Sequence, residues 1–455
     1  MEDIPLLNKP SFPDWPPNQA NQHIKKRRRY KWCWKNANSG CYQTTKYILP
    51  KGLEEVSWET KAMRGLQLVY CVPEKALGIV LKEVEKERDV WKHLYILNKL
   101  QIAYFTWQAN EKNEYYAKLP SASLNKVMRS DYRKVLNLLI RWGILEEKKG
   151  FCYSETPGEM RRTHNLFRLN EAMCGKLVRI FHNNEKKAAK AHELSVKAVD
   201  KAIAHDPEKR HLWDSLQRTA IDDKAFNYVE SPLSISIHQR ECYRMSVGSI
   251  FCKELYIKSD YRTGRVFTNV TNLWKQLRSF LSIDGESVCE VDISNCQPLL
   301  ASLLYPAKSE ERQKYLEVVL AGNFYRYLEK HSGRRYPDYG HLKKLTFKQV
   351  FFGKNSDGTR RPLLRALMKE FPEMYKIITE MKKRHKNRLA LALQEKEAFV
   401  VIHRIVPRLM NLGVPCLTVH DSVICKQCDE QTVWRVMSEE LRDLIGRECQ
   451  LKVTR

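Results

Sequence analysis

Two short β-prone segments, each carrying an aspartate at a strand end, constrain the fold of this chain most. In the first, Ser287–Ser294, alternation predicts a strand that carries Glu290 and Asp292 on one face. The second, Pro415–Cys425, contains two β-prone runs that join at Asp421, and it predicts a tight hairpin. We therefore expect an α+β fold in which these two aspartates converge at the ends of strands.

Paired carboxylates of this kind are suited to divalent cations. Two ions held about 3.5–4 Å apart serve in-line phosphoryl transfer, because one activates the attacking oxygen and the other stabilises the leaving oxygen. A site with few carboxylates, in which substrate phosphates complete the ligand set, favours Mg²⁺. The sequence therefore predicts that Asp292 and Asp421 hold two Mg²⁺ ions, for which Mn²⁺ could substitute. Either aspartate alone is more typical of a turn.

A lysine-rich helix is predicted between the two aspartates. Lys344, Lys348 and Phe352 recur at intervals of four residues, and four residues correspond to about 400° of helix rotation, so the three share one face. Gly353 is placed to end this helix. Ammonium groups beside an aromatic ring suit a triphosphate and its base. The alternative interpretation is a solvated lysine face with Phe352 in the core.

Four motifs resemble, in the same order, those of the family A DNA polymerases. The segment 344–353 resembles the family's fingers motif, and Asp292–Gln297 and Val419–Ser422 resemble its two palm motifs. Upstream, Tyr261–Val266 resembles the Thr-Gly-Arg segment near the primer end. The pattern is most similar to divergent transposon- and virus-associated polymerases, which are related to family A and to single-subunit phage RNA polymerases. The resemblance covers roughly residues 255–430.

This resemblance implies a right-hand polymerase palm of antiparallel strands, with helical fingers and thumb, that catalyses template-directed nucleotidyl transfer. Asp292 and Asp421 would hold the metal ions, with the Ile293 carbonyl as a further ligand. Lys348 would neutralise the departing pyrophosphate, and Lys344 would support the triphosphate. Phe352 would stack on the incoming base, and Gln297 would contact its sugar. Arg265 and His420 would lie at the primer terminus.

The departures from the family pattern concern sugar selection most. Gln297 replaces the acidic residue of the family's sugar gate, and Ser356 replaces the tyrosine that braces it. In addition, Lys344 replaces an arginine, and Ser422 replaces a glutamate after the second aspartate. A carboxamide can donate a hydrogen bond to a 2′-oxygen, which a carboxylate cannot do. We expect preference for dNTPs, with weaker discrimination against rNTPs than in a standard family A enzyme. A primase or RNA polymerase that uses the same palm is the alternative.

The charge of the chain agrees with a nucleic-acid partner. The formal net charge is +26, from 79 Lys and Arg against 53 Asp and Glu. Such a chain suits a DNA template-primer, since phosphate contacts release counterions. The segment 25–35 interleaves basic residues with Tyr30, Trp32 and Trp34 and could bind phosphates and stack bases. A solvated basic arm is the alternative interpretation of that segment.

We expect four regions along the chain. They are a basic N-terminal region (1–80), a winged helix-turn-helix-like DNA-binding domain (81–175), a helical thumb-like region (176–245), and the palm and fingers catalytic domain (246–455). In the second region, Ser130 is predicted to cap a helix with an apolar stripe at Tyr132, Val135, Leu136, Leu139 and Ile140. The residues predicted to face a phosphate backbone are Arg129, Arg133 and Lys134. Protein docking by the second region and a plain spacer role for the third are the alternatives.

Neither a membrane nor an extracellular setting is predicted. No apolar run approaches 18 residues, and the start of the chain lacks a signal-peptide pattern. The 13 cysteines have no disulfide-like rhythm, and Cys425 with Cys428 forms only half a zinc site. We expect a cytoplasmic protein in a bacterial or viral host, or a nuclear one if the host is eukaryotic. Replication proteins of the host element are further partners to expect. A non-catalytic, DNA-binding replication initiator is the alternative from a different functional class.

Overall fold

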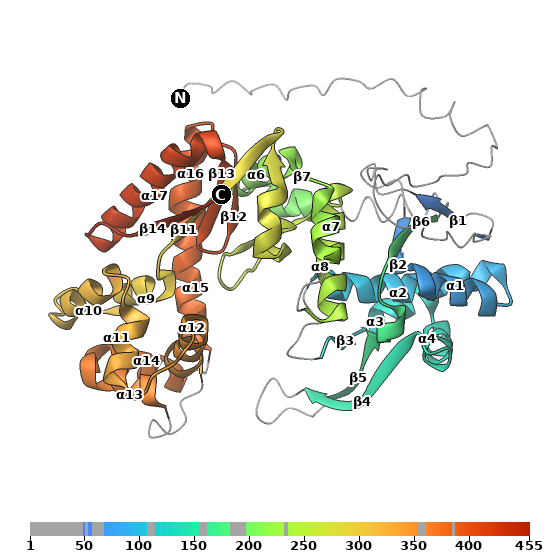
Figure 1. The fold of residues 1–455 in the computed structure, drawn as a ribbon, viewed down its shortest axis with the longest axis horizontal. Helices are drawn as coiled ribbons and strands as arrows, with labels where there is room; N and C mark the ends of the chain where they lie inside the picture. Colours follow the sequence, from blue (N-terminus) through green and yellow to red (C-terminus); the bar gives the residue numbers. More distant parts are fainter. Residues whose placement is uncertain are drawn as a thin grey trace, which may run out of the picture. The chain divides into compact units, whose positions relative to one another are not determined.

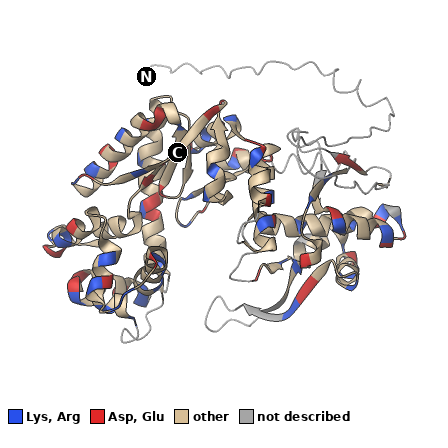
Figure 2. Cartoon of the chain, in the orientation of Figure 1, with Lys and Arg blue, Asp and Glu red and all other residues tan. Residues whose placement is uncertain are grey.

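In the computed structural model, every described residue belongs to one compact unit, Tyr47–Arg455. The structure describes residues 49–50, 53–56, 68–106, 114–119, 121–153, 162–182, 197–231, 235–353, 361–384 and 387–455 (Figure 1). The basic segment 25–35 and Ser356 lie outside the described residues. Among the described residues, lysine and arginine occur on many helices and strands rather than on one element (Figure 2).

A three-stranded antiparallel sheet joins two distant segments of the N-terminal half. Its order is β1-β6-β2, and its strands are β1 (Leu53–Val56), β2 (Leu68–Pro73) and β6 (Leu177–His182). Helix α1 (Glu74–Glu83) follows β2 directly, and the short 3₁₀ helix η1 (Glu87–Asp89) comes next. This sheet joins residues on either side of the region boundaries expected at 80 and 175.

After η1 and before β6, the chain forms a mixed set of helices and strands, in the order helix, strand, helix, helix, strand, strand. These elements are α2 (Val90–Phe105), β3 (Ala117–Lys118), α3 (Ser121–Met128), α4 (Asp131–Arg141), β4 (Leu145–Tyr153) and β5 (Arg162–Leu169). The strands pair antiparallel in the order β3-β5-β4, and the 3₁₀ helix η3 (Glu171–Met173) follows.

The predicted apolar face of α4 is confirmed. Tyr132, Val135, Leu136 and Leu139 are buried. Ser130 stands at the N-cap position of α4, as predicted, but its backbone is in the helical conformation (φ −67°, ψ −16°) and its side chain makes no capping hydrogen bond. An N-cap side chain reaches the free amides of the first turn from an extended backbone, which Ser130 does not have.

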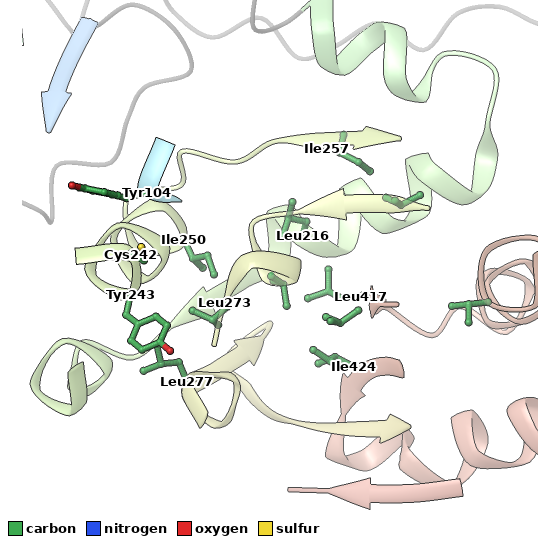
Figure 3. Close-up of a cluster of buried hydrophobic side chains, with 14 of the residues drawn as sticks. Tyr104, Leu216, Cys242, Tyr243, Ile250, Ile257, Leu273, Leu277, Leu417 and Ile424 are labelled. Carbon is green, nitrogen blue, oxygen red and sulfur yellow. The ribbon is translucent and has the colours of Figure 1, made fainter. Parts of the chain in front are cut away.

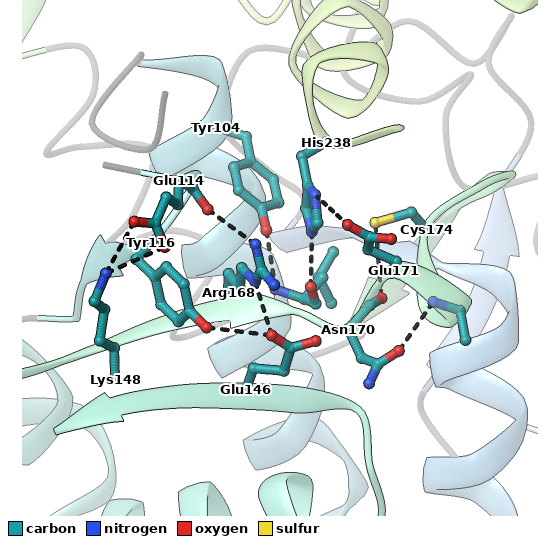
Figure 4. A network of polar contacts seen from close by, with 12 residues as sticks. Tyr104, Glu114, Tyr116, Glu146, Lys148, Arg168, Asn170, Glu171, Cys174 and His238 are labelled. Carbon is teal, nitrogen blue, oxygen red and sulfur yellow. Dashed lines mark hydrogen bonds and ion pairs between the residues drawn. The ribbon is translucent and has the colours of Figure 1, made fainter. Parts of the chain in front are cut away.

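A polar network fastens β4 and β5 to the helices behind them (Figure 4). Arg168 donates to Glu146 at 2.8 Å, so the two neighbouring strands are joined by an ion pair. The Tyr104 hydroxyl accepts from the Leu169 amide at 2.9 Å, and His238 contacts the Leu169 carbonyl at 2.8 Å. These buried bonds connect α2 and α8 (Ile237–Phe251) to the same end of β5.

The segment between β6 and the C-terminal half ends in a helix that is mostly buried. It contains α6 (Pro207–Arg218), β7 (Thr219–Ile221), α7 (Lys224–Glu230) and α8 (Ile237–Phe251). The α6 helix starts at Pro207, where Asp206 caps it by accepting from the Lys209 amide at 3.0 Å. Most residues of α8 are buried, and Cys242, Tyr243 and Ile250 belong to the cluster in Figure 3. Helix α8 is therefore a core element and does not offer an exposed surface to a duplex.

The largest sheet has six strands and contains both predicted aspartate segments. Its order is β12-β13-β11-β10-β7, with β14 also paired to β11. The strands not yet introduced are β10 (Leu281–Ile283), β11 (Glu286–Ile293), β12 (Cys416–Val419), β13 (Ser422–Lys426) and β14 (Leu451–Thr454). All pairings are antiparallel. A separate hairpin pairs β8 (Ile257–Ser259) with β9 (Val266–Thr268).

Helices make up most of the remainder. They are α9 (Cys296–Ala301), α10 (Glu311–Leu320), α11 (Phe324–His331), α12 (Tyr339–Thr346), α13 (Pro362–Glu370), α14 (Pro372–Arg384), α15 (Arg388–Val400), α16 (Val406–Asn411) and α17 (Glu430–Ile445). Two π-helical turns, η7 (Phe347–Phe351) and η9 (Val401–Ile405), continue α12 and α15. The short 3₁₀ helices are η4 (Val270–Asn272), η5 (Lys275–Phe280), η6 (Ser302–Leu304) and η10 (Gln427–Asp429). The fold is therefore α+β with antiparallel sheets, and no helix among the described residues is long and apolar enough to cross a membrane.

Candidate active site

The two aspartates singled out in the sequence lie at adjacent positions of the large sheet. Strands β11 and β13 are antiparallel neighbours, and Asp292 lies opposite Ser422. His420 has a left-handed backbone (φ 57°), which turns the chain between β12 and β13 just before Asp421. The Ile293 amide donates to the Asp421 carbonyl at 3.2 Å. Strand pairing thus places the two aspartates next to each other, as the sequence predicts.

Burial raises the pKa of both carboxyl groups to about 6. The next largest cause is a negative charge: Asp421 raises the pKa of Asp292, and Glu397 raises the pKa of Asp421. Lys343 acts in the opposite direction on both. Carboxylates that are desolvated and repel one another gain by binding a divalent cation, because the cation favours their ionised forms.

The protein ligands for such a cation are few. Within the described ranges, no group of three or more His, Cys, Asp and Glu side chains is arranged to hold a metal ion. Asp292, Asp421 and the Ile293 carbonyl, at the end of β11, remain the expected ligands. Mg²⁺ commonly binds one or two carboxylates and takes its other oxygen ligands from water and substrate phosphates. The residues present therefore fit Mg²⁺, and its binding stays a prediction.

Replacing either aspartate by asparagine is expected to stabilise the metal-free protein. Because the pKa of each carboxyl group is raised on folding, its ionised form lowers the free energy of unfolding at pH 7, and this cost is relieved as the pH falls through 6 towards 4. Asp292→Asn should raise the free energy of unfolding by roughly 1–3 kcal/mol at pH 7 and change it little at pH 4. Denaturant unfolding in EDTA measures this difference.

The same variant tests the metal. Added Mg²⁺ should raise the Tm of the unsubstituted chain and leave that of Asp292→Asn or Asp421→Asn nearly unchanged, because ligand binding stabilises only a chain that binds the ligand. An equal rise in all three proteins would contradict the assignment of the metal to these residues.

Glu290 lies on β11 two residues before Asp292 and forms polar contacts there. It is buried, it forms an ion pair with Arg278 at 2.8 Å, and it accepts from the Ser422 hydroxyl at 2.8 Å. The sequence pattern places Glu290 on the same strand face as Asp292, and this contact joins β11 to β13 on that face. Ser422, which departs from the family pattern, thus bonds a carboxylate instead of supplying one.

A second polar cluster forms around a residue that the sequence does not single out. Glu397, on α15, is 2% exposed. It accepts from the Gln297 amide at 2.6 Å and from the Arg265 guanidinium at 2.7 Å. The loop that carries Arg265 packs against α15, since a Cβ on Gly264 would lie 3.7 Å from that of Ala398. Three elements distant in the sequence therefore meet at one carboxylate.

Arg265 and His420, predicted to lie by the primer terminus, belong to the same neighbourhood. The Arg265 charge lowers the pKa of Asp421 and also that of His420. Burial, with Arg265 and Arg278, lowers the pKa of His420 to about 4, so its ring is neutral near pH 7. The ring packs edge-on against Phe267 of β9, with centroids 6.0 Å apart. A neutral imidazole can accept or donate a hydrogen bond without adding charge.

The lysine-rich helix predicted between the two aspartates is present, with one difference in geometry. The α-helix expected up to Gly353 changes to the π-helix η7 at Phe347, where the Phe352 amide donates to the Phe347 carbonyl at 2.7 Å. Lys344, Lys348 and Phe352 are all exposed, so a core position for Phe352, which is 41% exposed, is wrong. Spacing alone could not predict the π-turn, because i→i+5 bonding leaves no distinct apolar period.

Gly353 follows this turn for a steric reason. A Cβ at that position would lie 2.0 Å from the Lys348 carbonyl oxygen, so any side chain would displace the backbone. The Phe352 ring stacks on Phe347 with centroids 5.3 Å apart, which holds it at the exposed end of the helix.

Lys343 and Tyr325 are site residues that the sequence did not reveal. Lys343 is exposed on α12, lies 5.8 Å from the centroid of the Tyr325 ring, and lowers the pKa of both aspartates. The Tyr325 hydroxyl is buried without a hydrogen-bond partner among the described residues. Burial is the main reason that its pKa is raised, and the charge of Asp421 is a smaller cause in the same direction. The motif spacing favoured Lys344 and Lys348 and offered no signal for the lysine between Leu342 and Lys344.

Comparisons with known proteins add a distant likeness to solved structures. No protein-family model and no curated protein matches the chain. Among solved structures, the POL domain of Pol1 from M. smegmatis, in a complex with DNA primer-template and dNTP, is similar with a TM-score of 0.41 and 10% sequence identity. The match covers 59% of this chain and 73% of that chain.

Proposed function

We propose that this protein is a template-directed nucleotidyltransferase, a DNA polymerase that uses two Mg²⁺ ions. The observation that carries the proposal is the adjacency of Asp292 and Asp421, with their raised pKa values, at the ends of paired strands. Gln297 and Arg265 support it, because they join one cluster beside the aspartates through Glu397. A metal-dependent phosphoryl transfer needs such carboxylates together with polar groups that orient the substrate.

In this proposal each residue has a distinct task. Asp292, Asp421 and the Ile293 carbonyl hold the metal ions, which when bound activate the attacking oxygen and stabilise the leaving oxygen. Exposed Lys348 and Lys344 bind the triphosphate. Phe352 stacks on the incoming base, and Gln297 contacts its sugar. Arg265 and neutral His420 orient the primer terminus.

The proposal assigns the parts of a right hand to the fold. The six-stranded antiparallel sheet corresponds to the palm, and the helices from α10 to α14 correspond to the fingers. The thumb assignment changes in its details. Because α8 is buried on most of its surface, duplex contact falls to other residues of the 176–245 region, of which 183–196 lie outside the described ranges.

Primer extension by the full chain tests the proposal. We expect Mg²⁺-dependent extension of a primed DNA template with dNTPs, and its loss in EDTA. Separate dNTP and rNTP pools on DNA and RNA templates identify the substrates. A catalytic-efficiency ratio that favours rNTPs would replace the DNA polymerase with a primase or RNA polymerase. Template-primer binding without extension would favour the non-catalytic initiator.

We further propose that residues 90–169 form a winged helix that binds duplex DNA. The chain order α2, β3, α3, α4, β4, β5 and the sheet order β3-β5-β4 support this proposal. Arg129, Arg133 and Lys134 are exposed, and Arg133 and Lys134 lie on α4, the second helix of the pair. Exposed cations on this helix suit phosphate contacts beside a groove.

Reversal of two of these charges is expected to weaken duplex binding. The double variant Arg133→Glu, Lys134→Glu should reduce affinity at low salt and lower the slope of log K against log salt by about 2. Fluorescence anisotropy of the full chain across a salt series measures both quantities. The control, Lys82→Glu with Lys86→Glu, makes the same charge change at exposed positions outside α4. Equal losses in the two double variants would mean diffuse attraction rather than a docked helix.

A further inference from the structure

The carboxylate of Glu397 organises two residues to which the proposed function gives different tasks. Its Oε2 atom accepts from Gln297 Nε2 at 2.6 Å and from Arg265 Nη2 at 2.7 Å, and its Oε1 atom lies 2.6 Å from the same guanidinium nitrogen. Gln297 is the second residue of α9, Arg265 precedes β9, and Glu397 is on α15. One buried side chain therefore couples the sugar-side residue to the primer-side residue.

Glu397 also determines which atom of the Gln297 amide is available. A carboxylate only accepts hydrogen bonds, so the amide nitrogen must face Glu397. The Gln297 Oε1 atom is left without a hydrogen-bond partner among the described residues. The amide nitrogen carries two hydrogens, and the bond to Glu397 uses one of them, so this bond leaves the second able to donate to a 2′-oxygen. The Oε1 atom itself is buried, so Glu397 fixes the orientation of the whole amide group.

The three side chains form a balanced charge set. A buried carboxylate is destabilising unless a cation and hydrogen bonds compensate it, and here Arg265 and Gln297 do so. Loss of the negative charge would leave the half-buried guanidinium without its counter-ion. A second carboxylate at 297 would repel the first. The cluster therefore needs one carboxylate and one amide at positions 297 and 397. Hydrogen bonding alone does not require the carboxylate to be at position 397.

We propose that Glu397 is a positioning residue for sugar selection, and that it acts by holding Gln297 and Arg265 as one unit. This inference rests on the proposed nucleotidyl transfer. The acidic group that the family pattern leads one to expect at 297 is supplied from α15, one hundred residues further along the chain. Glu397 touches neither substrate nor metal in this scheme, and it acts through the two residues that it orients.

An exchange of the acid and the amide tests the inference. The proteins to compare are the unsubstituted chain, Glu397→Gln, Gln297→Glu, and the double variant that carries both changes. The measurement is the catalytic efficiency of single-nucleotide extension with a matched dNTP and rNTP on one primed DNA template. We expect each single variant to lose about tenfold or more in efficiency with dNTP, since each disrupts a buried charge set, and to shift the dNTP-to-rNTP ratio. The double variant should recover most of both.

Controls separate positioning from folding. Glu395→Gln makes the same chemical change on the same helix, outside the cluster, and should keep the original ratio. The Tm of every variant is measured alongside. Two outcomes would overturn the inference and leave the polymerase proposal in place. One is that the losses of catalytic efficiency in the two single variants add up in the double variant, and the other is a fall in Tm with an unchanged dNTP-to-rNTP ratio. If the unsubstituted chain extends no primer, the proposed function fails, and the inference fails with it.

Discussion

Alanine at position 292 or at position 421 is expected to abolish Mg²⁺-dependent primer extension. Each substitution removes a carboxylate from a pair that strand pairing holds together and that has no third acidic, histidine or cysteine ligand among the described residues. Loss of a metal that both activates and stabilises reacting oxygens should slow transfer on the order of 10³-fold or more. Single-turnover extension with saturating template-primer measures the effect.

Template-primer binding should survive in both variants, because affinity comes mainly from distributed phosphate contacts. A suitable control is Asp284→Ala, in the exposed turn between β10 and β11 of the same sheet, where Asp284 pairs with Arg218. That variant should extend primers normally. Activity of Asp292→Ala or Asp421→Ala within about tenfold of the unsubstituted chain would remove the two-metal assignment.

The local parts of this site could be predicted from the sequence, because they follow from short-range patterns. Alternation in Ser287–Ser294 gives β11, and the paired runs around Asp421 give the β12–β13 hairpin. Both patterns follow from the twofold period of a strand, which few residues are enough to display. The convergence of Asp292 and Asp421 was expected because both lie at strand ends, and the strand register gives it a geometric basis.

The parts that could not be predicted depend on long-range packing. Glu397 lies between Lys396 and Ala398 on a helix with several charged residues, and nothing in that pattern marks one glutamate as buried. Its burial depends on Arg265 and Gln297, which come from distant segments. The π-turn η7 was missed for a related reason, since the tertiary environment rather than local propensity stabilises such turns. Ser130 was misjudged because residue type alone does not determine backbone conformation at a cap.

The Lys348→Ala variant is expected to slow the chemical step on the order of 10²-fold, because a cation aligned with the leaving pyrophosphate stabilises charge that develops in the transition state. Lys348 is exposed on η7, where its side chain is free to meet a triphosphate from the solvent side. Rapid-quench single-turnover kinetics separate this effect from weaker nucleotide binding. Lys348→Arg should recover part of the rate, since it keeps the charge.

Alanine variants of the neighbouring lysines on α12 and η7 show which of them serves the leaving group. Lys343 acts on the pKa of both aspartates, whereas the four-residue spacing favours Lys344 and Lys348. If Lys348 serves the leaving group, Lys348→Ala should reduce the rate of transfer most, and Lys343→Ala should chiefly weaken the binding of the nucleotide, whose phosphates lose an attractive charge. A larger rate loss in Lys343→Ala would move the leaving-group role to α12. An effect of Lys348→Ala on DNA affinity alone would make Lys348 a backbone contact, because a group that acts only on the transition state changes the rate rather than binding.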